Sequence, residues 1–162
     1  MGSGKSSYGK ELAEAMGLSF IDLDTEIEKQ EKMTIKDIFN TKGEDYFREA
    51  EHKALLKTES SDNVVIATGG GAPCFHDGVL WMNGHGLTIY LKLFENELKK
   101  RIETGMESRP LLANIDAEGL DNFIYKTMKD RAYYYHQAKM VIDPVLLPPV
   151  ELAPVLKMQN IL

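Results

Sequence analysis

The chain has 162 residues, of which 43% are hydrophobic and 27% charged, and its net charge is −6 at pH 7. This length suits one domain with a core of its own, and the composition is that of an ordinary globular protein. The acidic balance argues against general nucleic-acid binding, and the single Cys74 excludes an internal disulfide or a cysteine-clustered metal site. With no apolar run of membrane-spanning length and no signal peptide, we expect a cytoplasmic protein without membrane or nucleic-acid partners.

The first seven residues, MGSGKSS, contain the second half of a phosphate-binding loop. The full pattern is G-x-x-x-x-G-K-[ST], placed between a strand and a helix, where Lys5 would contact nucleotide phosphates and the Ser6 hydroxyl would hold Mg²⁺. Glycines let successive backbone N–H groups surround an anion, and the positive N-terminal end of the next helix adds to this attraction. The alternative is a Gly/Ser-rich end that matches by chance, although helical spacing from Tyr8 onward favours the loop.

Hydrophobic periodicity and turn residues predict strands that alternate with helices along the chain. The expected elements are, in order, a helix over Lys5–Met16 ended by Gly17, a strand over Ser19–Asp24, a helix over Glu26–Lys32 with Thr25 as N-cap, a helix that starts at Thr34, breaks at 42–44 and resumes over Asp45–Lys57, strands over Val64–Thr68 and Thr88–Leu93, a helix over 95–104, a helix over Glu118–Gln137, a strand over Lys139–Asp143 and a final helix. The apolar run at 64–68 is typical of a strand buried on both faces. Pro154 should kink the final helix or delay its start. This alternation predicts an α/β fold with a parallel sheet.

Two stretches stand where such folds bind ligands, beyond the C-terminal ends of the strands. Asp22 and Asp24 end one expected strand, and Gly69–Gly71 directly follows another. Carboxylates at this place suit a metal ion or a proton transfer, although either one could simply cap the following helix. The three glycines form either a tight turn or a backbone segment that approaches a ligand closely.

Arginine is rare in this chain. Among 19 basic residues, the arginines are Arg48, Arg101, Arg109 and Arg131. A rigid and permanently charged guanidinium suits the binding of a carboxylate or a phosphate, so these positions are candidates for anion binding. The alternatives are an ordinary helical pair between Arg48 and Glu51, and a solvated loop position for Arg109.

Six motifs together resemble the shikimate kinase family: Gly2–Ser6, Asp22–Asp24, Phe47–Glu51, Gly69–Gly71, Arg109–Leu112, and Arg131 followed by Tyr134. The resemblance covers residues 1 to about 143. It implies a P-loop kinase fold, an α/β three-layer sandwich whose central parallel sheet has the strand order 2-3-1-4-5. It also implies one domain over 1–162, with substrate-binding helices at about 25–57 and a lid at about 105–117. The implied reaction is ATP-dependent phosphorylation of the shikimate 3-hydroxyl to 3-phosphoshikimate, a step of aromatic amino acid biosynthesis, by a monomer.

The resemblance also implies a role for each matching residue. The nucleotide would be bound by Gly2, Ser3, Gly4, Lys5, Ser6, Ser7, Arg101 and Arg109. Shikimate would be bound by Asp24, Arg48, Gly70, Gly71 and Arg131, with the two arginines on its carboxylate. Asp24 would accept a proton or orient the attacking oxygen, while Lys5 and Arg109 would stabilise the transferring phosphoryl group. Ser6 and Asp22 would hold Mg²⁺, Asp22 through water.

The start of the chain departs from the family pattern. The first glycine of the loop would fall two residues before Met1, and the preceding strand, central in the family's sheet, is absent. A strand of five or six residues plus the start of the loop adds about ten residues. We therefore expect that the natural protein begins that much earlier and that Met1 is an internal methionine. A chain that truly began here would leave a gap in the sheet, and we expect it to fold weakly with little activity.

Two rival functions stay open at this point. Another small-molecule P-loop kinase, such as a gluconate kinase, shares Lys5 and the lid but does not need Arg48, Arg131 and the triple glycine together. A catalytically silent, nucleotide-binding or scaffolding homologue is favoured by the shortened loop, and it predicts that Lys5→Ala changes nothing measurable. An ATPase that acts on nucleic acid is disfavoured by the acidic charge.

Overall fold

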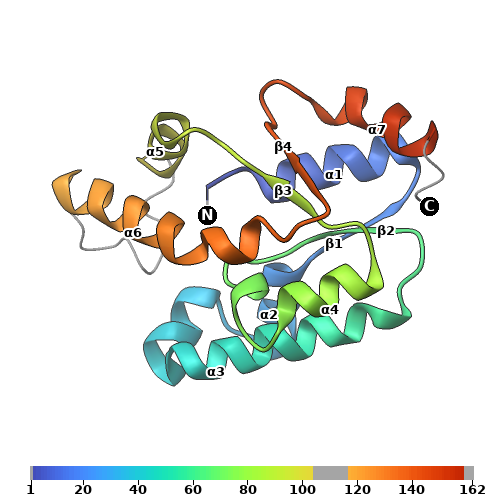
Figure 1. Cartoon of the computed structure of the whole chain (residues 1–162). Helices are drawn as coiled ribbons and strands as arrows, with labels where there is room; N and C mark the ends of the chain where they lie inside the picture. The colour runs from blue at the N-terminus through green and yellow to red at the C-terminus, as the bar shows by residue number, and fades with distance from the viewer. Residues whose placement is uncertain (1, 104–116, 159–162) are drawn as a thin grey trace.

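The computed structural model describes residues 2–103 and 117–158, in which short parallel strands lie between two groups of helices (Figure 1). The elements of this part are α1 (Lys5–Met16), β1 (Ser19–Asp22), α2 (Leu23–Glu31), α3 (Ile35–Lys57), η1 (Thr58–Ser60), β2 (Val64–Ala67), η2 (Ala72–Cys74), α4 (Gly78–His85), β3 (Ile89–Leu91), α5 (Glu95–Glu103), α6 (Ala117–Tyr135), β4 (Met140–Ile142) and α7 (Pro149–Met158). The expected alternation of strands and helices is confirmed. No helix in the described ranges is long and apolar enough to cross a membrane.

The strands form two separate parallel pairs. β1 pairs with β2, with Ser19 opposite Val64, and β3 pairs with β4, with Ile89 opposite Met140. Within the described residues nothing joins β2 to β3, so the structure has two two-stranded sheets in place of one continuous sheet. The expectation that β2 is buried on both faces is therefore wrong for most of its length, because its outer edge borders an open space and most of its residues are only half-buried.

Helix α1 is placed by a glycine at each end. Gly4 and Gly17 both have left-handed backbone angles, with φ of 81° and 75°, which glycine adopts without strain. Between them, Leu12 and its neighbours one turn away are buried against α7 and the β3–β4 pair. Gly9 lies so close to the ring of Phe20 that α1 also packs over β1. The helix thus bridges the two strand pairs (Figure 1).

Helix α2 begins earlier than the sequence suggested. The Asp22 carboxylate accepts a hydrogen bond from the Thr25 N–H at 3.3 Å, so Asp22 is the N-cap, and Thr25 lies inside the first turn. This start buries Leu23 almost completely and moves Asp24 from the expected strand onto the helix. The predicted cap at Thr34 and the break at Gly43, where φ is 84°, are both confirmed.

Two further elements differ from the sequence expectations. Helix α4 was not predicted, because its apolar residues do not gather on one side and glycines stand at its first residue and near its end. Helix α7 starts at Pro149, a favourable first position for proline, so its start is not delayed by Pro154 in its interior.

Three hydrophobic clusters hold these elements together. The first joins α1 and α7 to the β3–β4 pair, the second joins α2 and α3 to the β1–β2 pair, and the third joins α5 and α6. The second contains Ile38, which is fully buried, and Phe39 and Phe47, whose rings lie 4.7 Å apart. This cluster fixes the helices that carry the acidic and basic residues of the site.

Candidate active site

The residues of the expected phosphate loop form an anion-binding turn at the start of α1. Gly2 and Gly4 both have positive φ, and Ser3 between them is buried. A left-handed turn that leads into a helix N-terminus collects backbone N–H groups and the positive end of the helix dipole. Arg101 of α5 donates to the Ser3 carbonyl at 3.1 Å, so a second helix brings a positive charge to the loop. Ser7 is exposed in the first turn of α1.

Ser6 and Asp22 meet beside this loop. The Ser6 hydroxyl donates to the Asp22 carboxylate at 2.5 Å, which joins the first turn of α1 to the end of β1. Hydroxyl and carboxylate oxygens are the donors that Mg²⁺ prefers, and this ion usually takes one or two protein groups and several waters. The pair fits such an ion. Asp22 also caps α2, which was the alternative role. Its Oδ2 atom accepts the hydrogen bond from Ser6, and its Oδ1 atom accepts the one from the Thr25 N–H.

A buried arginine lies at the centre of the neighbouring region. Arg48 is only 6% exposed, and its guanidinium donates to Glu51 at 2.7 Å and to Glu44 at 2.9 Å. Its carbon centre also lies 4.6 Å from the ring centre of Phe75. The pairing with Glu51 that the sequence offered as an ordinary helical contact is thus present, but it is a buried ion pair rather than a surface one.

The triple glycine lies against these charged side chains. A Cβ atom on Gly69 would collide with Glu51, and one on Gly71 would collide with the Arg48 guanidinium. The two glycines are therefore needed for close approach and not merely for a turn. Among the described residues, neither Gly70 nor Gly71 donates its N–H to a backbone carbonyl. Those N–H groups suit the oxygens of a ligand, as the sequence suggested.

Arg131 and Tyr135 approach the same glycines from α6. The Tyr135 hydroxyl donates to the Gly70 carbonyl at 2.7 Å. Burial raises the pKa of this hydroxyl, while the charge of Arg131 and a hydrogen bond from it act in the opposite direction. Sequence reasoning paired Arg131 with Tyr134 and missed Tyr135, although residues four apart share one face of a helix.

Asp24 lies close to Gly69, and the charges of Lys5 and Arg48 both act on its carboxylate. Its side chain is open to solvent on one side, yet loss of water around the rest of the carboxylate is the main cause that raises its pKa. The negative charges of Asp22 and Glu28 raise the pKa further, whereas Lys5 and Arg48 lower it. The Asp24 carboxylate is therefore within electrostatic reach of both Lys5 and Arg48.

Glu51 was the other functional candidate that sequence reasoning left aside. Burial raises its pKa, Arg48 lowers it by charge and hydrogen bonding, and the nearby Asp24 carboxylate raises it. Its Oε1 atom is buried and has no hydrogen-bond partner in the described part of the chain. An orphaned carboxylate oxygen beside Asp24 and Gly69 is a further acceptor that a ligand or a water molecule can satisfy.

The structure brings together most of the residues that the sequence singled out. Ser6 of the loop bonds to Asp22, and Arg101 of α5 bonds to the loop at Ser3. Asp24 lies against Gly69 and Arg48 against Gly71, while the charge of Arg131 on α6 acts on Glu51. Arg109 and residues 105–116 of the expected lid lie outside the described residues.

The fold and the glycine turn at the start of α1 define an α/β protein of the P-loop kinase type, and comparisons with known proteins specify the family. The sequence model of the shikimate kinase family matches residues 1–155. A shikimate kinase from Parabacteroides distasonis is 43% identical over 143 residues, which are 88% of this chain and 83% of that protein. One from Flavobacterium johnsoniae is 39% identical over 147 residues, 88% of this chain and 86% of that protein.

Solved structures agree with this assignment. The crystal structure of a shikimate kinase from Bacteroides thetaiotaomicron has a TM-score of 0.87 at 32% identity and covers 99% of this chain and 94% of that one. The shikimate kinase from Acinetobacter baumannii, solved in complex with shikimate, has a TM-score of 0.85 at 30% identity over 99% of this chain and 88% of that one. The chain belongs to the shikimate kinase family, which confirms the resemblance seen in its sequence.

Proposed function

We propose that this chain transfers the γ-phosphoryl group of ATP to the 3-hydroxyl of shikimate. The observation that carries the proposal is the position of Asp24, which lies against Gly69 and whose carboxylate is within reach of the charges of both Lys5 and Arg48. A phosphoryl donor on the loop and a hydroxylated acid beside the arginines would then meet at this carboxylate. The family membership of the chain supports the same reaction.

The nucleotide would occupy the loop end of the cleft. Backbone N–H groups of Gly2–Gly4 would surround the phosphates, and the Lys5 ammonium would contact the β- and γ-phosphates. Ser6 and Asp22 would hold Mg²⁺, which when bound neutralises charge on the phosphate oxygens. Arg101, already bonded to the Ser3 carbonyl, adds positive charge at the loop. Arg109 would stabilise the charge on the transferring group.

Shikimate would occupy the arginine end of the cleft. Arg48 and Arg131 would pair with its carboxylate, since guanidinium groups bind planar anions with two parallel hydrogen bonds. The N–H groups of Gly70 and Gly71 would face its ring oxygens. Asp24 would accept a hydrogen bond from the 3-hydroxyl and align the oxygen with the phosphorus atom, taking the proton as transfer proceeds.

We further propose that residues 1–162 act as one cytoplasmic, monomeric domain.

A substrate panel tests this function directly. ATP is supplied with shikimate, gluconate or a nucleoside monophosphate, and the released ADP and the phosphorylated product are measured. We expect turnover with shikimate alone and a product phosphorylated at the 3-position by phosphorus NMR. Turnover with gluconate or a nucleotide would assign the cleft to another small-molecule kinase, and no turnover with any acceptor would favour a silent homologue.

Lys5→Ala tests the phosphate loop. Losing a preorganised cation at the phosphoryl group should lower kcat/KM about 10²- to 10³-fold. Lys10→Ala is the matched control, because Lys10 is exposed further along the same helix and should leave the rate unchanged. Steady-state kinetics with a coupled ADP assay measures both. A Lys5→Ala rate equal to that of the parent chain would contradict catalysis at this loop.

Tyr135→Phe tests the support of the triple glycine. The variant removes the hydrogen bond to the Gly70 carbonyl, so the Gly70–Gly71 peptide should lose its fixed orientation. We expect KM for shikimate to rise several-fold while KM for ATP stays constant, with a loss of about 1 kcal/mol in the free energy of unfolding. Tyr133→Phe is the control, since Tyr133 is 74% exposed on the same helix. Equal changes in both KM values would assign Tyr135 a purely structural role.

A further inference from the structure

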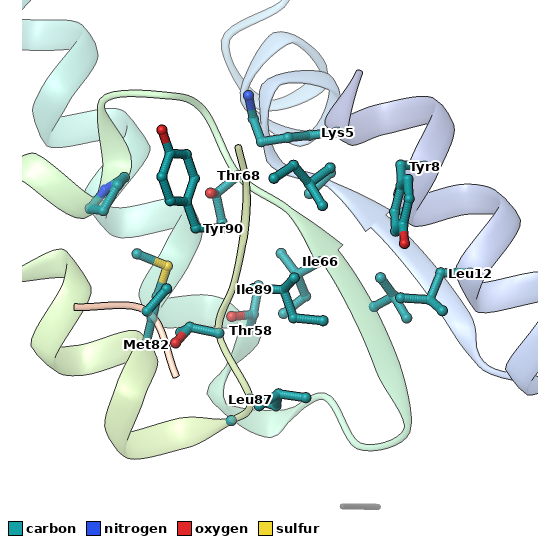
Figure 2. Close-up of a pocket in the computed structure, with 18 of the residues that line it drawn as sticks. Lys5, Tyr8, Leu12, Thr58, Ile66, Thr68, Met82, Leu87, Ile89 and Tyr90 are labelled. Carbon is teal, nitrogen blue, oxygen red and sulfur yellow. The ribbon is translucent and has the colours of Figure 1, made fainter. Parts of the chain in front are cut away.

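The segment that begins with the triple glycine folds around the guanidinium of Arg48. It follows Thr68, which together with Lys5 lines the cavity of about 800 Å³ beside β2 (Figure 2). A Cβ atom on Gly71 would collide with the guanidinium, so the backbone lies directly against that group. The guanidinium carbon also lies over the ring of Phe75, 4.6 Å from the ring centre. One short segment therefore contacts the same cation twice.

Backbone hydrogen bonds make the chain turn back between these two contacts. The Cys74 N–H donates to the Gly71 carbonyl at 2.7 Å, and the Gly78 N–H donates to the Phe75 carbonyl at 2.9 Å. Gly78 has no room for a side chain, because a Cβ atom there would collide with the Ala72 carbonyl oxygen. The chain thus passes close to itself between η2 and α4, and this close approach fixes the position of the Phe75 backbone.

The corner after Phe75 has an uncommon backbone conformation. His76 and Asp77 have φ values of 50° and 54°, in the left-handed region that residues with a side chain rarely adopt. Such a conformation costs free energy and persists where surrounding contacts hold it in place. Here the His76 ring stacks on the ring of His52 at 4.9 Å, and its Nε2 atom lies 3.5 Å from the Glu49 carboxylate. Both partners belong to α3, so the corner is held on the helix that carries the arginine.

The corner docks on α3 one turn beyond Arg48. His52 lies four residues after Arg48, and residues at this spacing share one face of a helix. Stacking of His76 on His52 therefore brings the preceding residue, Phe75, to the level of the guanidinium. Phe75 is 40% exposed and belongs to none of the three hydrophobic clusters of described residues, so burial in a core does not explain its position.

A ring over a guanidinium constrains how that group binds an anion. The negative face of the ring attracts the cation, and the ring keeps water from that side, which strengthens the hydrogen bonds that the guanidinium donates. In the described part of the chain, Nε, Nη1 and Nη2 of Arg48 each donate once to Glu44 or Glu51. One further N–H remains on each terminal nitrogen, in the plane of the group. A ligand carboxylate must therefore bind at the edge of the guanidinium.

We propose that Phe75 is a positioning residue for Arg48. Its ring fixes the plane of the guanidinium, so that the remaining N–H groups point toward the carboxylate of the substrate. The corner at His76 and Asp77 holds the ring in place through its contacts with α3. This role rests on the proposed function, in which Arg48 binds the carboxylate of shikimate.

Substitutions of Phe75 test this role through the Michaelis constants of the two substrates. Phe75→Leu keeps an apolar side chain but removes the ring, so KM for shikimate should rise about two- to fivefold, the effect of one cation–π contact at a partly exposed site. KM for ATP should not change. Phe75→Tyr keeps the ring and should match the parent chain. Phe94→Leu is the control, since Phe94 is 71% exposed and no cation lies over its ring among the described residues.

Two kinetic outcomes would overturn the proposal. If Phe75→Leu raised both KM values equally, the ring would have a general structural role. If Phe75→Tyr were as impaired as Phe75→Leu, the aromatic face would not be what positions Arg48.

A second measurement observes the guanidinium itself and needs no turnover. Because the chain has few arginines, the side-chain NMR signals of Arg48 in an isotopically labelled sample can be assigned from their loss in Arg48→Lys. Slowly exchanging Nη–H signals should be present in the parent chain and in Phe75→Tyr. They should be lost in Phe75→Leu, because an uncovered guanidinium rotates and exchanges its protons with water.

This measurement separates the positioning role from the proposed function. If the signals behaved as expected but the parent chain did not phosphorylate shikimate, the proposed function would fail, and Phe75 would still position Arg48. Identical Arg48 signals in the parent chain and in Phe75→Leu would overturn the positioning role, whatever the substrate.

His76→Ala tests whether the corner acts through the ring. The variant removes the stack on His52 and the contact with Glu49, so KM for shikimate should rise by no more than in Phe75→Leu. Combined with Phe75→Leu it should add nothing, because residues that act through one another have non-additive effects. His85→Ala is the matched control, since His85 also stacks on a ring and lies 3.6 Å from a glutamate, outside this corner. Additive rises in KM would contradict the role of the corner.

Discussion

Asp24→Asn is expected to lower kcat for shikimate phosphorylation by about 10²- to 10⁴-fold, the usual contribution of a positioned general base. The amide has the size of the carboxylate but cannot take the proton of the 3-hydroxyl. It also removes the negative charge on which Lys5 and Arg48 both act. KM for ATP should change little, because in the proposed function the loop at Gly2–Gly4 would bind the phosphates. Steady-state kinetics measures both constants.

The control for this variant is Glu26→Gln on the same helix. Glu26 pairs with Lys29 at the surface, at an N–O distance of 2.6 Å, and this exposed pair should contribute nothing to the rate. A kcat for Asp24→Asn within about tenfold of the parent, below the range expected of a general base, would remove Asp24 from catalysis. The nearby cap residue Asp22 is not a suitable control, because it also bonds to Ser6.

The raised pKa of Asp24 predicts how activity depends on pH. A base must be ionised, so kcat/KM should fall as pH drops through this raised pKa, at a higher pH than for an ordinary aspartate. Stability should change in the opposite direction. The folded state binds the proton more tightly than the unfolded state, so this group's contribution to stability falls as pH rises from the ordinary value to the raised one. A pH–rate profile should lose its acidic limb in Asp24→Asn.

Helix ends and breaks that depend on neighbouring residues could be predicted from the sequence. Gly17 ends α1 because only a residue tolerant of positive φ fits there, and Thr34 caps α3 with its own hydroxyl. The break at Gly43 follows in the same way. The parallel alternation of strands and helices was likewise readable from apolar periodicity. Each of these features depends on residues within a few positions of one another.

Features set by tertiary contacts could not be read in this way. Helical spacing allows either Tyr134 or Tyr135 to lie on the face of Arg131, and only the packing of α6 against the glycine turn brings the Tyr135 hydroxyl to Gly70. The start of α2 was misplaced because the burial of Leu23 favours an earlier helix with Asp22 as its cap. Likewise, the pair between Arg48 and Glu51 looks like any helical pair until its burial is known.

Glu51→Ala is expected to lower the free energy of unfolding by about 3 to 5 kcal/mol, because it leaves a buried guanidinium without its closest partner. Glu51 is 2% exposed and its carboxylate lies 2.7 Å from Arg48, which is itself 6% exposed. The same loss should let Arg48 move, so KM for shikimate should rise as well. Glu51→Gln keeps one oxygen acceptor for Arg48, so its free energy of unfolding should lie between those of the parent chain and Glu51→Ala. Urea unfolding gives the stabilities.

Glu44→Ala supplies a matched comparison, since Glu44 pairs with the same arginine on the same helix. Its side chain is 48% exposed, so water replaces it when it is removed, and the expected loss is about 0 to 1 kcal/mol. The ion pairs that the two variants remove therefore differ mainly in how far the glutamate is buried away from water. If they lowered stability equally, burial would not set the strength of this ion pair, and the anchoring of Arg48 would have to come from the ring of Phe75 and its aromatic neighbours.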